Sequence, residues 1–233
     1  MEAQALLDRL QDEIEACSAC PFIKSFDGES IPEHKLSPHW TWWFKNKFPC
    51  KKEMYYILFK YDGKSSVVLI TLRPSTEWIF DTADLMLANA LKNNCLVKER
   101  FELIDNTFIF YEGILITDLV KCRGFAKEAK QIKDLPKACI GFLKEELNII
   151  RESLGEEPKI MIMGKSSYYQ RLMLNLIWKY RKELGIQLKD KQEIPSISFH
   201  SYRARLPHKY EQYKEYSQEI REALRKLGVL MRN

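Results

Sequence analysis

Apolar residues recur along the chain in two spacings, one typical of helices and one typical of buried strands. A spacing of three or four residues predicts helices over residues 2–16, 82–93, 134–154, 166–184 and 209–227. Short apolar runs predict strands over residues 54–60, 67–72, 159–163 and 194–199, with a further pair of strands within 107–120. We expect the first two strands to form a hairpin around Asp62-Gly63, and Gly113 to kink or turn the chain within 107–120.

The order of these elements predicts the fold class. Strands that alternate with helices favour an α/β fold, which we expect to be a three-layer α/β/α sandwich with a mainly parallel central sheet. A chain of 233 residues fits a single domain over residues 1–233. Residues 21–62 interrupt the pattern and are rich in aromatic residues, so we interpret them as an inserted segment. Its aromatic side chains either stack on bases or pack beneath a long loop.

Helix boundaries and charge add a few constraints. Asp134 and Pro136 suit the entrance of the helix over 134–154. A net charge of +5 permits a polyanionic partner without requiring one. No apolar run reaches the roughly 20 residues that span a bilayer, so we expect an intracellular protein (cytoplasm or nucleoid) without a membrane partner. We also expect a monomer.

Four of the six cysteines are distributed like metal ligands. Cys17 and Cys20 are three residues apart, and Cys122 and Cys139 follow far downstream, at the end of a predicted strand and in a predicted helix. Four thiolates can form a tetrahedral site for an iron–sulfur cluster or for zinc. The separation of the second pair favours a cluster, while zinc and unrelated free thiols remain alternatives. We expect Cys95, beside a helical pattern, to lie in the core.

The sequence around Cys122 resembles a known family. The segment Ile116-Thr117-Asp118-Leu119-Val120-Lys121-Cys122-Arg123 is similar to the strand-to-cluster segment of iron–sulfur uracil-DNA glycosylases, in which a base-reading residue precedes a Val-Lys-Cys-Arg run. That family also has an N-terminal Cys-x-x-Cys and a fourth cysteine at a similar spacing. The resemblance covers about residues 10–20 and 64–225. It implies a uracil-DNA-glycosylase-like fold, a structural [4Fe–4S] cluster on Cys17, Cys20, Cys122 and Cys139, and DNA as partner.

The same resemblance implies hydrolysis of the N-glycosidic bond of a flipped base. In the family, a Gly-Glu-Ala-Pro-Gly-like loop positions the attacking water with its carboxylate. Here the matching segment is Thr71-Leu72-Arg73-Pro74-Ser75, so the proline agrees but Leu72 replaces the acid. Asp81 is our candidate for a replacement catalytic carboxylate, although it also suits a cap for the helix that follows. Phe80, or Trp78, could stack on the base, with a place in the core as the alternative for either, and Pro74 and Ser75 would line the base pocket.

Asp118 stands where the family has an asparagine that reads the edge of uracil. An ionised carboxylate only accepts hydrogen bonds, which suits a base with an exocyclic amine, such as cytosine or adenine. Uracil would require a protonated Asp118. The alternative is an aspartate that caps a turn at the end of a strand.

A second motif of the family is a His-Pro-Ser-like loop that enters the minor groove. His200 and Ser201 match its histidine and serine, without the proline. His200 could stabilise the departing base anion, Ser201 could contact DNA, and Arg203 and Arg205 suit phosphates. Two other function classes stay open: a catalytically silent nucleic-acid-binding or damage-sensing protein of the same fold, and an enzyme acting on free nucleosides or modified RNA.

Overall fold

The computed structural model describes residues 3–17, 44–47, 54–72, 82–100, 108–121, 133–164, 167–198 and 210–229. The helices are α1 (Ala3–Glu15), α2 (Thr82–Asn93), α3 (Lys137–Leu154), α4 (Ser167–Tyr180), α5 (Tyr210–Lys226) and a one-turn 3-10 helix, η4 (Lys191–Glu193). The strands are β1 (Phe44–Lys47), β2 (Met54–Tyr61), β3 (Val67–Thr71), β4 (Val97–Arg100), β5 (Phe108–Gly113), β6 (Leu115–Asp118), β7 (Lys159–Gly164) and β8 (Ser196–Ser198). All five predicted helices are present, so their apolar spacing was a sufficient signal.

Four strands form an all-parallel sheet, which we call sheet B. Its strand order is β6-β3-β7-β8, and helices pack against it, so the protein is a mixed α/β structure. The register places Thr71 beside Asp118 at the ends of β3 and β6. The chain moves from β3 outward to β6 and then returns to β7 on the other side of β3. The carboxyl ends of β3 and β7 therefore form the topological switch point of the sheet.

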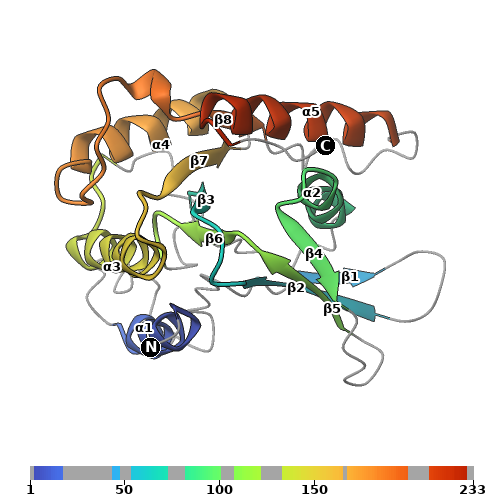
Figure 1. Cartoon of the computed structure of the whole chain (residues 1–233), viewed down its shortest axis with the longest axis horizontal. Helices are drawn as coiled ribbons and strands as arrows, with labels where there is room; N and C mark the ends of the chain where they lie inside the picture. The colour runs from blue at the N-terminus through green and yellow to red at the C-terminus, as the bar shows by residue number, and fades with distance from the viewer. Residues whose placement is uncertain are drawn as a thin grey trace, which may run out of the picture.

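Side chains that alternate along the strands of sheet B divide the core into two clusters. Val68 and Ile70 belong to a cluster with α1, α3 and α4, whereas Val67 and Leu69 belong to a cluster with α2 and α5. Figure 1 shows α1 and α3 on one side of the sheet and α2 on the other. Strands buried on both faces read as continuous apolar runs, which explains the sequence of β3 and β7.

The remaining strands form a second sheet, sheet A, with the order β1-β2-β5-β4. Its central strands β2 and β5 run parallel, and β1 and β4 pair with them antiparallel at the two edges. The chain passes from β2 in sheet A to β3 in sheet B, and again from β5 to β6. One chain segment thus supplies β2 and then β3, and another supplies β5 and then β6 (Figure 1). The two segments run parallel to each other in both sheets.

The predicted hairpin at residues 54–72 is wrong. β2 and β3 lie in different sheets, and the turn at Asp62-Gly63, where Gly63 has a φ of 72°, connects those sheets. The backbone N–H of Asp62 donates to the carbonyl oxygen of Gly113 at 2.9 Å. A turn motif in the sequence indicates that the chain changes direction, but it does not indicate which strand pairs with the strand before the turn.

The pair of strands within 107–120 also belongs to two sheets, and Gly113 marks the bend between them. A Cβ atom at Gly113 would lie 2.0 Å from the carbonyl oxygen of Leu96, so only glycine fits where β4 approaches. Gly113 was predicted as a kink, and this is confirmed.

Two smaller predictions are corrected. Asp134 does not cap α3, since the residue at the cap position is Pro136 and it makes no side-chain cap hydrogen bond. Asp134 instead accepts hydrogen bonds from Lys179 and Tyr180, which lower the pKa of its carboxyl. Cys95 is exposed rather than in the core, and its φ of 56° ends the turn after α2.

Candidate functional site at the carboxyl edge of sheet B

Several predicted site residues follow, in the sequence, strands that end at the carboxyl edge of sheet B. Thr71, Asp118, Gly164 and Ser198 end the four parallel strands at this edge. Segments 73–81 and 199–209 follow directly in the chain after β3 and β8. In open α/β sheets, ligands bind in the crevice outside the carboxyl ends, at the switch point. This topology therefore directs attention to the edge that contains Asp118.

Most of the predicted site residues lie outside the described residues. They are Pro74, Ser75, Phe80, Asp81, His200, Ser201, Arg203 and Arg205 for the base and DNA, and Cys20 and Cys122 for the metal. Their roles stay predictions. The described residues among those predicted are Asp118, Cys17 and Cys139.

Asp118 lies completely buried at the end of β6 and faces the side of the sheet that α2 and α5 cover. Its exposed fraction is 0%, and the hydroxyl of its register partner Thr71 donates to its Oδ1 atom. The backbone hydrogen bond from Leu119 N to Thr71 O, at 2.8 Å, continues the pairing beyond the strand. A buried carboxylate that is oriented by a neighbouring hydroxyl is held in one position. The arrangement fixes an acceptor at this edge, and that acceptor is closed to solvent.

Leu72 occupies the place where the resembling family has its catalytic acid. Its side chain is 7% exposed and lies in the core cluster with α1, α3 and α4. Val120 N donates to Leu72 O at 2.9 Å, which fixes this backbone beside the end of β6. Leu72 thus serves packing, and a catalytic carboxylate must come from elsewhere in the chain if there is one.

A buried ion pair that was not predicted from the sequence lies on the opposite face of the sheet. The Lys121 ammonium donates to Glu146 Oε1 and Oε2, at 2.8 and 2.7 Å, and to the Thr117 hydroxyl oxygen at 2.6 Å. The Thr117 hydroxyl in turn donates to Glu146 Oε2 at 2.8 Å. We call these three residues the Lys121 network. All three are 2% exposed or less, and every ammonium hydrogen of Lys121 has an acceptor.

The electrostatics of the Lys121 network reflect this burial. Burial raises the pKa of the Glu146 carboxyl, and the charge and hydrogen bonds of Lys121 oppose that rise. The sequence did hold a signal, because Glu146 lies within the apolar stripe of Leu143, Leu147 and Ile150 on α3. A charged residue inside such a stripe indicates a buried partner. The network joins α3 to the segment between Asp118 and Cys122.

Two of the four predicted metal ligands lie in or next to helices that pack together. Cys17 is half-buried just after the end of α1, and Cys139 is buried in the first turn of α3. α1 packs against α3 in the core. Buried or half-buried thiols are suitable ligands for a soft metal. Within the described ranges, no group of three potential ligands is assembled.

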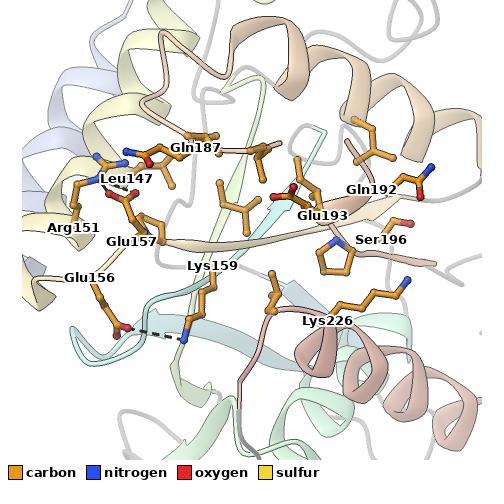
Figure 2. Close-up of a pocket in the computed structure, with 18 residues that line it drawn as sticks. Leu147, Arg151, Glu156, Glu157, Lys159, Gln187, Gln192, Glu193, Ser196 and Lys226 are labelled. Atoms are coloured by element: carbon orange, nitrogen blue, oxygen red, sulfur yellow. Dashed lines mark hydrogen bonds and ion pairs between the residues drawn. The ribbon is translucent and has the colours of Figure 1, made fainter. Parts of the chain in front are cut away.

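A large cleft lies at the opposite, amino edge of sheet B. It has a volume of about 950 Å³ and lies between the ends of α3 and α5 and the first residues of β7 and β8. Figure 2 shows its charged rim, where Arg151 pairs with Glu157 at 3.0 Å and Lys159 approaches Glu156 at 4.0 Å. Because these charges neutralise one another, the cleft lacks a concentrated charge for an ionic ligand. None of the predicted site residues lines it.

The described helices include none that is long and apolar enough to cross a membrane. Comparisons of the chain with protein-family models, with curated proteins and with solved structures found no match.

Proposed function

We propose that the protein is a DNA-repair glycosylase of the uracil-DNA-glycosylase type, with a three-layer α/β/α fold. It binds DNA, accepts a flipped base at the carboxyl edge of sheet B and hydrolyses the N-glycosidic bond. The observation that carries the proposal is the buried Thr71–Asp118 pair at the ends of two adjacent parallel strands. Asp118 lies in the strand-end segment whose sequence resembles the base-reading segment of that family.

In this proposal Asp118 selects the base. Its position is fixed by the hydroxyl of Thr71, so the carboxylate presents acceptor oxygens in a defined direction. An exocyclic amine is the group on a base that matches a fixed acceptor, and cytosine and adenine both carry one. A buried site that leaves a polar group unmatched loses roughly 1–3 kcal/mol, which is sufficient to discriminate between bases.

The remaining roles are assigned from the sequence. Asp81 orients the attacking water, and His200 stabilises the anion of the departing base. Phe80 stacks on the flipped base beside Pro74 and Ser75. The DNA contacts fall to Ser201, Arg203 and Arg205. The topology supports this assignment to the extent that these residues follow β3 and β8, whose carboxyl ends share an edge with Asp118.

The cofactor in this proposal is a [4Fe–4S] cluster, with zinc as the alternative. Cys17 and Cys139 would supply two thiolates from the packed pair α1 and α3, and Cys20 and Cys122 the other two. The group would act as a structural crosslink between the N-terminal helix and the rest of the domain. Hydrolysis needs no electron transfer, so the proposal gives it no catalytic role.

One observation favours a second candidate, a catalytically silent nucleic-acid-binding protein of the same fold. Leu72 is buried in the core at the position where the family carries its acid. Unless Asp81 replaces that acid, the protein would retain the shape of the base site without the group that orients water.

A base-release experiment separates the two candidates. Oligonucleotides that contain uracil, cytosine, hypoxanthine or common lesions are incubated with the protein and then treated with alkali, which cleaves the strand at abasic sites. The proposal predicts strand cleavage on at least one substrate and its loss in Asp81→Asn. Binding without release of any base would favour the silent protein instead. Absence of both binding and release would contradict both candidates.

A further inference from the structure

Basic side chains are concentrated in and after α4. Residues 167–191 contain six basic and two acidic side chains, whereas the whole chain has 37 basic and 32 acidic residues. This stretch therefore carries a net charge of +4 and is one of several basic segments of the chain. Such a local excess attracts polyanions more strongly than an even distribution of the same charge.

The charge lies on one side of the helix. Exposed residues recur with a spacing of three or four, whereas Met173, Leu176 and Ile177 on the other side are buried in the core. We call this side the α4 outer face; it consists of the exposed Tyr168, Arg171, Asn175, Lys179 and Lys182 and the half-exposed Trp178 and Arg181, with the exposed Glu183 next to Lys182.

Several cations of this face are not neutralised by neighbouring carboxylates. Lys179 pairs with Asp134, which lies at the rim of the face. Within the described ranges, no acidic side chain forms an ion pair with Arg171, Arg181 or Lys182. These three cations are available to phosphates.

Aromatic rings are interleaved with these cations. Tyr168 is 44% exposed and is the large apolar side chain that stands out as exposed among the described residues. Near the other end of α4, the Arg181 guanidinium lies 3.9 Å from the centroid of the half-exposed Trp178 ring. Exposed rings, and arginines stacked on rings, are platforms for unpaired bases, whose π faces are not covered by a complementary strand.

The position of the α4 outer face connects it to the candidate site. α4 begins three residues after Gly164, which ends β7 at the same edge of sheet B as Asp118. With its 14 residues it then extends about 21 Å away from that edge. Tyr168 and Arg171 lie at the end of the helix near the site, and Trp178, Arg181 and Lys182 lie at the far end.

We propose that the α4 outer face binds single-stranded DNA and leads it toward the carboxyl edge of sheet B. Arg171 and Lys182 contact phosphates, while Tyr168 and the Trp178–Arg181 pair stack on bases. This rests on the proposed function for the destination of the strand, but the binding surface itself follows from the charge and aromatic exposure of α4. Unpaired DNA is preferred because stacking on these rings requires exposed base faces.

The test is a binding titration with fluorescently labelled single-stranded DNA of about 15 nucleotides, a length that covers a typical binding site. The double variant Arg171→Gln/Lys182→Gln should bind more weakly and lose about 1.4 from the slope of log K against log salt, about 0.7 for each phosphate contact. Tyr168→Ala should weaken binding about tenfold, and Tyr168→Phe, which keeps the ring, should restore it.

A control separates this surface from general charge. Lys64→Gln/Lys98→Gln removes the same charge from exposed positions outside α4 and should leave affinity and slope unchanged. The proposal is overturned if the control weakens binding as much as the α4 variant does. It is also overturned if duplex DNA or RNA binds in preference and Tyr168→Ala has no effect.

The experiments on DNA binding and on base release test the two proposals separately. If the α4 variants lose DNA binding while wild-type protein releases no base, the α4 outer face is supported and the glycosylase proposal fails. If wild-type protein releases a base and the α4 variants bind and react like wild type, the glycosylase proposal stands and the α4 outer face is rejected.

Discussion

At the scale of single residues, burial decides how tyrosines of the two sheets respond to pH. Tyr111 is 1% exposed, and its ring stacks on Phe59 with centroids 5.5 Å apart. Burial, assisted by the charge of Glu99, raises the pKa of Tyr111 to about 12. Burial also raises the pKa of Tyr61. In the unfolded chain a tyrosine loses its proton near pH 10, so the folded state holds protons that the unfolded state has lost.

This linkage predicts an alkaline loss of stability. The contribution of Tyr111 is fully present below about pH 10 and is lost as the pH rises through 12. Tyr111→Phe keeps the stacked ring and removes the titrating hydroxyl, so its free energy of unfolding should fall less steeply between those values. Denaturant titrations at several alkaline pH values measure this. If the free energy of unfolding fell equally steeply with pH in wild-type protein and in Tyr111→Phe, the raised pKa of Tyr111 would be contradicted.

Two glycines offer a matched test of local geometry. Gly113→Ala places a Cβ 2.0 Å from a backbone oxygen of Leu96, and should cost about 1–3 kcal/mol or more through the forced shift of β4. Gly141 lies exposed on α3, and a Cβ there meets nothing within 4 Å. Gly141→Ala should therefore stabilise the protein by about 0.5–1 kcal/mol. Thermal unfolding of both variants checks the opposite signs, and equal shifts would contradict the close approach at Gly113.

At the scale of elements, the Lys121 network joins α3 to the end of β6. Removal of one partner leaves a buried charge without its counterion, so Lys121→Met and Glu146→Leu should each cost about 3–5 kcal/mol. The double variant should cost much less than the sum, because it removes both charges. The partly exposed pair of Lys92 and Glu99 is the control, and Lys92→Gln should cost about 1 kcal/mol or less. Additive losses in the double variant would show that the network contributes no coupling.

The proposed cluster makes a prediction for α1 and α3. Cys17→Ser and Cys139→Ser should each remove the brown colour and the bound iron of anaerobically purified protein, and each should lower the unfolding temperature. Cys95→Ser, at an exposed position after α2, is the matched control and should retain both properties. Colourless wild-type protein with stoichiometric zinc would decide for zinc, and metal-free wild-type protein would contradict the cofactor.

Helices were predictable from the sequence because their apolar spacing is local. α2 and α3 end at the predicted residues, since an amphipathic stripe is a property of one segment alone. Strand partners were less predictable. β3 pairs with β6 and β7, which follow it by more than 40 residues, and the nearby turn at Asp62-Gly63 indicated the wrong partner. β4 was missed because its short, charged sequence Val-Lys-Glu-Arg carries no apolar pattern.

At the scale of the whole molecule, the parallel sheet assembles a candidate site from distant segments. The sequence indicated Asp118 through its neighbours, and the structure adds its burial and its partner Thr71. The hydroxyl of Thr71 could not be identified in advance, because its role depends on the register between β3 and β6. The buried Lys121 network likewise depends on the contact between α3 and the end of β6.

The central claim is that Asp118 selects the base that the protein accepts. Its most direct test compares the base-release profile, or the binding profile if no base is released, of wild-type protein and Asp118→Asn. An amide donates as well as accepts, so it satisfies both the O4 and the N3–H of uracil. The account predicts a shift of about tenfold or more toward uracil. Asp134→Asn, which changes an exposed aspartate before α3, should leave the profile unaltered. A folded Asp118→Asn protein with the wild-type base profile would contradict the account.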